Sequence, residues 1–239
     1  MALQDFCYIF GCASPCSSLS GNFVEWARQV KVDSTIYMIR IDIKHFFMSG
    51  TPEHLAEYAS RILPQGHRRI YHDAVLWFLH NQYIKSGVIK HSTVFKVVRG
   101  AGMGLPASGP IADSVFYTLA EKSWGTNPLV MEAHGIRHYV RFKDDLFVIA
   151  TNRALTRKWY RGLCRAASTV FDLHVEEVSN IEVCMLSLRV RMEGAHLRVT
   201  PNPPPTSSPL SITSAHRPPV HLSWPKACIE NNRFLYAHG

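Results

Sequence analysis

The chain has 239 residues, which is long enough for one large domain or two small ones with a buried core. Hydrophobic residues make up 46% and charged residues 18%, a globular balance that excludes an intrinsically disordered chain. The net charge of +8 favours a polyanionic partner. No apolar run approaches the ~18 residues of a membrane span, and the start lacks the basic segment of a signal peptide. We therefore expect an intracellular protein of the nucleus or cytoplasm that is neither secreted nor bound to a membrane.

Both helices and strands are predicted in the first half of the chain. Thr51, Pro52 and Glu53 predict a helix start, because threonine caps well, proline suits the first turn and glutamate favours the helix's positive end. In chain order we predict a helix at 23–32, a strand at 35–43, helices at 51–63 and 69–85, a strand at 93–98, a glycine-rich loop at 100–109 and a helix at 111–124.

The second half begins with a strand–turn–strand unit at 137–150. A helix at 155–170 comes next, and then strands near 173–178, 183–191 and 195–200. Eight of the 14 prolines fall between Pro201 and Pro225. Proline removes backbone donors and blocks regular structure, so this segment is predicted to be a linker or extended arm.

Two segments place carboxylates at the ends of apolar strands. Asp42 closes the first strand, and Asp144 and Asp145 lie between two β-prone arms that suggest a hairpin. Taken alone, each is also typical of a cap or a surface turn. Taken together, they could hold two Mg²⁺ ions, because Mg²⁺ prefers carboxylate oxygens and two-metal sites catalyse phosphoryl transfer.

The glycine-rich segment Gly100–Pro110 follows a strand and opens a helix. Its spacing is G-x-G-x-G rather than the G-x-G-x-x-G of dinucleotide-binding folds, and two prolines interrupt it. A loop whose backbone approaches a base pair or a sugar fits the pattern better, and a plain connecting loop is the alternative.

These three segments, in this order, resemble motifs A, B and C of reverse transcriptases. Asp42-Ile-Lys-His-Phe-Phe47 resembles the D-x-K-x-F-F form of group II intron and other non-LTR-type enzymes. Met103-Gly-Leu-Pro-Ala-Ser-Gly-Pro-Ile-Ala-Asp113 is similar to motif B, and Phe142-Lys-Asp144-Asp145 to the aromatic-x-Asp-Asp box of motif C. Ser214-Ala-His216 with Trp224-Pro225 resembles the arm that precedes the thumb in Penelope-like elements.

The resemblance implies an α+β fold, a right-hand polymerase palm in which an antiparallel sheet packs on helices, with partial fingers and a truncated thumb. It implies an RNA-directed DNA polymerase that extends a primer with dNTPs on an RNA or DNA template, using two Mg²⁺ ions or Mn²⁺. The implied metal ligands and catalytic residues are Asp42, Asp144 and Asp145. Phe47 aligns with the residue that selects dNTPs, and the residues implied to contact nucleotide and template are Gly104, Leu105 and Pro106.

Leu186 and Leu188 align with the primer grip, although plain core packing is the alternative for both. The resemblance implies a fingers remnant at 1–34, a palm at 35–200 that includes finger-side helices at 52–90, and a proline-rich arm with the thumb's start at 201–239. The short segments at both ends suggest a second hypothesis, a catalytically inactive retroelement fragment that only binds nucleic acid or a partner. A third is an unrelated basic binding module whose Asp pair is a turn.

Overall fold

A computed structural model describes residues 19–32, 36–85, 94–102, 105–186 and 188–202, and the expectations for 203–239 lie outside the described residues. The chain divides into two compact units, which we describe separately. The middle unit is Ile41–Glu176, and the terminal unit combines Met1–Arg40 with Glu177–Gly239. The predicted domain boundaries at 34 and 200 stay predictions.

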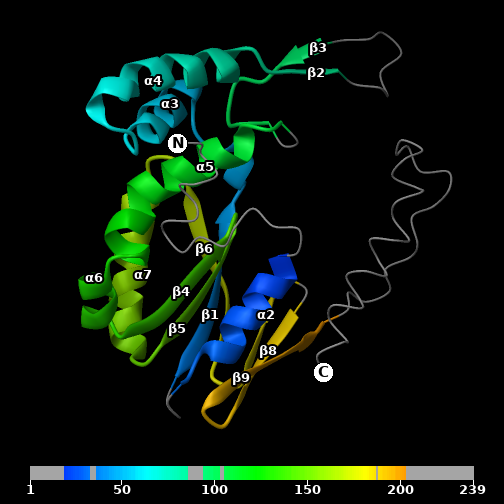
Figure 1. The fold of residues 1–239 in the computed structure, drawn as a ribbon, viewed down its shortest axis with the longest axis vertical. Helices are drawn as coiled ribbons and strands as arrows, with labels where there is room; N and C mark the ends of the chain where they lie inside the picture. The colour runs from blue at the N-terminus through cyan, green and yellow to red at the C-terminus, as the bar shows by residue number, and fades with distance from the viewer. Residues whose placement is uncertain (1–18, 33–35, 86–93, 103–104, 187, 203–239) are drawn as a thin grey trace, which may run out of the picture. The chain divides into compact units, whose positions relative to one another are not determined.

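A four-stranded sheet has the strand order β4-β5-β1-β6 (Figure 1). Strand β1 is Tyr37–Lys44, β4 is Ile136–Phe142, β5 is Asp145–Ala150 and β6 is Asp172–Ser179. β4 and β5 form an antiparallel hairpin in which Phe142 pairs with Asp145. Every residue of β5 after Asp145 is buried, as expected for an inner strand whose two faces are both covered. The predictions of a strand at 35–43 and a hairpin at 137–150 are confirmed.

Helices of the middle unit pack on this sheet. Helix α5, Ser108–Phe116, runs on as a π-helical segment, η2, Tyr117–Gly125, and α7, Arg153–Ala167, lies beside it. Trp159 of α7 is fully buried, and its indole N–H donates to the carbonyl of Trp124 at 2.9 Å. A side chain at Gly162 would place its Cβ 2.1 Å from the Trp124 ring, so only glycine permits this close approach of α7.

The segment between β1 and α5 contains α3, Pro52–Ser60, and α4, Gln65–His80. Thr51 caps α3 as predicted, because its hydroxyl accepts from the His54 amide at 3.3 Å. The prediction that the second helix reaches residue 85 is wrong. The Asn81 side chain donates to the Trp77 carbonyl at 2.7 Å at the helix end, and Tyr83–Lys85 form β2, which pairs with β3, Val94–Lys96.

Another short helix, α6 at Pro128–Ala133, was not predicted. Its start carries ordinary signals, since the Asn127 side chain accepts from the Leu129 amide at 3.1 Å and Pro128 occupies the first turn. No helix among the residues that the structure describes is long and apolar enough to cross a membrane.

The terminal unit contains α2, Leu19–Gln29, and a three-stranded antiparallel sheet with the order β7-β8-β9. The single strand predicted at 183–191 is instead two strands, β7 at Glu182–Met185 and β8 at Leu188–Glu193, and β9 is His196–Pro201. The turn between β7 and β8 contains Leu186 in a left-handed conformation with φ of 51°. Helices combined with antiparallel strands confirm the α+β class.

Candidate active site

Asp42 lies near the C-terminal end of β1, where buried and partly exposed residues alternate along the strand. The neighbouring isoleucines Ile41 and Ile43 are buried, and the Asp42 side chain is 19% exposed. The Lys44 ammonium lies 2.9 Å from Asp42 and 3.4 Å from Glu176. The hydrogen bond to Asp42 raises the pKa of Lys44, against the opposing effect of desolvation. Asp42 therefore has a cation of its own chain beside it.

Asp144 lies in the two-residue turn between β4 and β5. Its carbonyl accepts a hydrogen bond from the Ile43 amide at 2.9 Å, which joins the turn to β1 beside Asp42. Paired strands lie about 4.8 Å apart, so this bond brings the carboxylate segments of motifs A and C to adjacent positions. The preceding residue, Lys143, adopts φ of 49°, and Asp145 is the first residue of β5. The structure thus brings Asp42, Asp144 and Asp145 to neighbouring ends of two strands.

The arrangement of these carboxylates can be compared with the needs of a divalent cation. Their oxygens are the ligand type that Mg²⁺ prefers, and they come from two adjacent strands. Within the described residues, however, no three Asp, Glu, His or Cys side chains converge closely enough to hold an ion. The donor chemistry therefore fits Mg²⁺, while Asp42 is oriented toward Lys44.

The glycine-rich loop contacts the turn after β1. The Ala101 amide donates to the Phe47 carbonyl at 2.7 Å, and the Gly100 amide donates to the Gly50 carbonyl at 2.9 Å. Gly100 has φ of +74°, and a Cβ there would lie 2.3 Å from the Phe47 oxygen, so any side chain would separate the two segments. Motifs A and B are therefore joined through their backbones.

Two further hydrogen bonds hold this loop on the side of α5. The buried Gln82 side chain accepts from the Gly102 amide at 2.6 Å. The Ser108 hydroxyl, in the first turn of α5, donates to the Gly102 carbonyl at 2.6 Å. Gln82 was not identified in the sequence, because it lies in a segment predicted to be helical.

The residues expected to contact nucleotide and template lie around this loop. Phe47 belongs to a short 3₁₀ turn, η1 at Phe46–Met48, and is half-buried with its ring 5.1 Å from that of Phe46. Leu105 is 40% exposed and Pro106 is exposed. Gly104 lies outside the described residues, and the roles of all four stay predictions.

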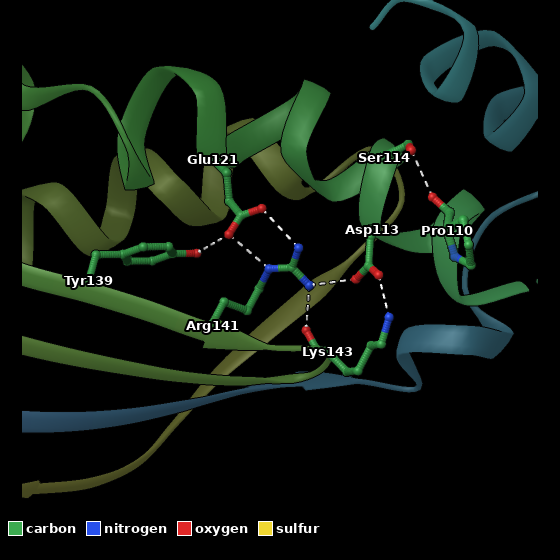
Figure 2. A network of polar contacts seen from close by, with 7 residues as sticks. All are labelled: Pro110, Asp113, Ser114, Glu121, Tyr139, Arg141 and Lys143. Atoms are coloured by element: carbon green, nitrogen blue, oxygen red, sulfur yellow. Dashed lines mark hydrogen bonds and ion pairs between the residues drawn. The ribbon is translucent and has the colours of Figure 1, made fainter. Parts of the chain in front are cut away.

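A buried network of charged side chains connects the motif B helix to the motif C hairpin (Figure 2). Both carboxylate oxygens of Glu121 accept from the Arg141 guanidinium, at 2.8 and 2.9 Å, and the Tyr139 hydroxyl donates to Glu121 at 2.9 Å. Asp113 accepts from Arg141 at 2.9 Å and forms a close ion pair with Lys143. Arg141 also donates to the Lys143 carbonyl at 2.8 Å, so it fixes the turn that contains Asp144.

Arg141 also contacts motif A. Its guanidinium carbon lies 5.8 Å from the ring centroid of Phe46 and 5.2 Å from that of Phe116, which is cation–π range. The side chains of Arg141 and Glu121 are 5% and 1% exposed. Burial alone would lower the pKa of Arg141, but the charges of Glu121 and Asp113 raise it well above its usual range. Arg141 therefore stays charged and contacts all three motif segments.

The sequence contained one signal for this network that our predictions did not use. Arg141 interrupts a β-prone arm, and a charged side chain requires a partner wherever the fold buries it. Its partner, Glu121, lies 20 residues away on the helix, at a distance that no local periodicity reveals.

The two primer-grip candidates belong to the terminal unit. Leu186 is half-buried in the β7–β8 turn, and Leu188 is 1% exposed and pairs with Met185 and Pro201. Leu188 thus packs in the core of its own sheet, which is the alternative that the sequence left open. The primer-grip role of both leucines stays a prediction.

No protein-family model and no curated protein sequence matches the chain. Among solved structures it is similar to apo telomerase from Candida tropicalis, with a TM-score of 0.52 and 14% identity over 84% of this chain and 35% of that one. It is also similar to telomerase from Candida albicans in complex with the TWJ fragment of telomeric RNA, with a TM-score of 0.55 and 10% identity over 84% of this chain and 37% of that one.

The chain has the fold of a right-hand polymerase palm. At such low identities the likeness shows the fold alone. The palm chain spans about a third of the length of both telomerases. The palm fold confirms the architecture implied by the motifs.

Proposed function

We propose that the palm chain is an RNA-directed DNA polymerase domain of a retroelement, of the non-LTR, group II intron or Penelope-like kind. The observation that carries the proposal is the hydrogen bond from the Ile43 amide to the Asp144 carbonyl. It aligns two carboxylate segments that are far apart in the sequence, as two-metal nucleotidyl transfer requires. The substrates of this proposal are dNTPs, a primer and a nucleic-acid template.

In this proposal Asp42, Asp144 and Asp145 hold two Mg²⁺ ions, with Mn²⁺ as an alternative. The ions would activate the primer 3′-hydroxyl as a nucleophile and neutralise charge on the departing pyrophosphate. Phe47 would select deoxyribose, and the backbone of Gly104, Leu105 and Pro106 would face the nucleotide and the template. The hydrogen bonds of Gly100 and Ala101 to the turn after β1 support this placement of the loop beside Asp42.

Lys44 is a counter-ion for Asp42 in the absence of a divalent cation. Its ammonium contacts Asp42 at 2.9 Å and Glu176 at 3.4 Å, so it can release Asp42 and keep Glu176 as its partner. A tethered cation in this position limits the repulsion among neighbouring carboxylates. Divalent binding at Asp42 then requires a displacement of the Lys44 side chain.

The hairpin of β2 and β3 supports a nucleic-acid partner. Tyr83 is 58% and Phe95 49% exposed, and the cations Lys85 and Lys96 lie beside them on the same two strands. No acidic residue occurs in the described part of this hairpin. Aromatic rings that stack on bases, next to cations that contact phosphates, are typical of single-stranded nucleic-acid binding. We assign this surface to the template strand.

One observation favours a second candidate, a palm that binds nucleic acid without catalysis. Asp42 is already paired with Lys44, and the described carboxylates do not converge on a common point. This candidate requires the same basic surfaces but no function for Asp144.

A primer-extension assay separates the two candidates. The wild-type chain, Asp42→Asn, Asp144→Asn and the control Asp73→Asn are compared on an RNA template with Mg²⁺. Asp73 is exposed on α4, and its one ion-pair partner among the described residues is His72, so its variant should behave like wild type. Loss of at least about 100-fold in both site variants is expected, since each removes a ligand of the reacting centre. Template binding by all four chains without dNTP incorporation would instead establish the second candidate.

A further inference from the structure

Helix α7 carries a row of arginines on the face that is turned away from the sheet. Arg153, Arg157, Arg161 and Arg165 succeed one another at four-residue spacing, and all are exposed. At 1.5 Å per residue, each step along the row is ~6 Å. Lys158 lies beside this row, and the helix contains no acidic residue. The arginine row is therefore a continuous basic surface.

Three of the four arginines in the row are not neutralised by the residues that the structure describes. Arg157, Arg161 and Arg165 form no ion pair or side-chain hydrogen bond within the described residues. Like charges at four-residue spacing destabilise a helix. The row therefore opposes the stability of α7, unless an external anion neutralises it.

The opposite face of α7 excludes one class of partner. A basic amphipathic helix can insert its apolar face into a lipid surface. Here the residues of that face, Trp159, Leu163 and Ala167, are fully buried, and Trp159 contacts both Trp124 of η2 and the ring of Tyr139 on β4. Only the charged face is accessible, so the partner must be recognised through its negative charge.

We propose that the arginine row of α7 binds the phosphate backbone of RNA outside the proposed active site. Regularly spaced guanidinium groups suit regularly spaced phosphates, and such contacts are independent of base sequence. α7 lies far from the β2–β3 hairpin in the middle unit, so this surface is separate from the one assigned to the template strand (Figure 1). The inference rests on the proposed function, because RNA is the polyanion that this function brings to the palm. The row would hold a part of that RNA away from the reacting centre.

The test is a salt titration of RNA binding by the full chain. An unstructured fluorescent RNA is bound to wild type and to the triple variant Arg157→Gln, Arg161→Gln and Arg165→Gln. The matched control is Arg189→Gln, Arg191→Gln and Arg198→Gln, which removes the same charge from exposed positions of β8 and β9. Each lost contact to a single strand lowers the slope of log K against log salt by ~0.7, so a change of about two is expected for the α7 variant alone.

Two results would overturn the proposal. One is equal binding and equal salt slope for the α7 variant and its control. The other is that the α7 variant still binds RNA but no longer binds duplex DNA, anionic vesicles or an acidic peptide. Circular dichroism verifies that both variants fold. Because the readout is binding, the result is independent of catalysis, and a parallel measurement on Asp144→Asn should show the wild-type slope even if primer extension fails.

Discussion

Arg141 and Glu121 form a bidentate ion pair in which both carboxylate oxygens accept from the guanidinium, at 2.8 and 2.9 Å. The two side chains are only 5% and 1% exposed. A pair so deeply buried gains little net stability over apolar side chains of the same size. Removal of one partner is costly nevertheless, because the other partner is then left charged and desolvated.

We expect Arg141→Met to lower the free energy of unfolding by about 3 kcal/mol or more, because Glu121 loses both of the N–H groups that the Arg141 guanidinium donates to it. The double variant Arg141→Met with Glu121→Met should recover a large part of this loss. Urea denaturation measures both values. The control Arg61→Gln breaks the exposed pair with Glu57 and should change stability by less than about 0.5 kcal/mol. A double variant no more stable than the single one would contradict the buried-pair explanation.

Asp113 should hold the turn that contains Asp144. In Asp113→Asn the ion pair with Lys143 is lost, while Arg141 keeps a neutral acceptor. The turn then moves more freely, and the Ile43 amide that donates to the Asp144 carbonyl should exchange its hydrogen about tenfold faster.

Native-state hydrogen exchange monitored by NMR measures this effect without any need for catalysis. The amide of Val148, at the centre of the sheet, should keep its protection in Asp113→Asn. Glu57→Gln, which breaks an exposed ion pair on α3, is the matched control. Unchanged exchange at Ile43 would show that Asp113 does not position the turn.

Lys44→Met should tighten Mg²⁺ binding at least about twofold, because the ammonium no longer competes for Asp42. Calorimetric titration of the chain with Mg²⁺, in the absence of nucleic acid, gives the affinity. Lys122→Met removes the same charge from an exposed position of η2 and should leave the affinity at its wild-type value. Weaker binding in Lys44→Met would mean that Lys44 supports the site rather than competing for it.

His138 should make the palm less stable in mild acid. Burial lowers the pKa of His138, and the charge of Arg137 lowers it further. The folded state therefore binds a proton less readily than the unfolded state. Stability is complete above the unfolded pKa of about 6.5 and is lost as the pH falls through that value toward the folded one. Between pH 7.5 and 5.5 the melting temperature should fall less in His138→Gln than in wild type, and parallel curves would contradict this explanation.

The sequence predicted the elements whose signals are local. Thr51 caps α3 where the threonine–proline–glutamate start required it, and the hairpin around Asp144 is explained by its two apolar arms. The end of α4 was misplaced because Tyr83 to Lys85 continue a helical pattern. In the structure the Gln82 carbonyl accepts a hydrogen bond from the distant Val97 amide at 2.9 Å. Tertiary hydrogen bonds decide such a boundary, and local propensity cannot reveal them.

The candidate carboxylates were found because the motifs preserve their order in the chain. The residues that fix their geometry were not found, because Gln82, Asp113 and Glu121 act through partners on other elements. Asp113 lies at the end of motif B, but the pattern gave no sign that it pairs with Lys143. A sequence motif therefore suggested the chemistry that we propose, and only the tertiary structure identified the side chains that hold the proposed carboxylates in position.

The bond between Ile43 and Asp144 also has a kinetic consequence. It closes a loop of about 100 residues, and loops of that length form slowly because their contacts are far apart in the chain. The β4–β5 hairpin can form by itself, but it presents Asp144 without Asp42 until β1 docks beside it. Assembly of the carboxylates is thus expected late in folding, so in a nascent or partly folded chain the basic surfaces would form before the proposed metal site.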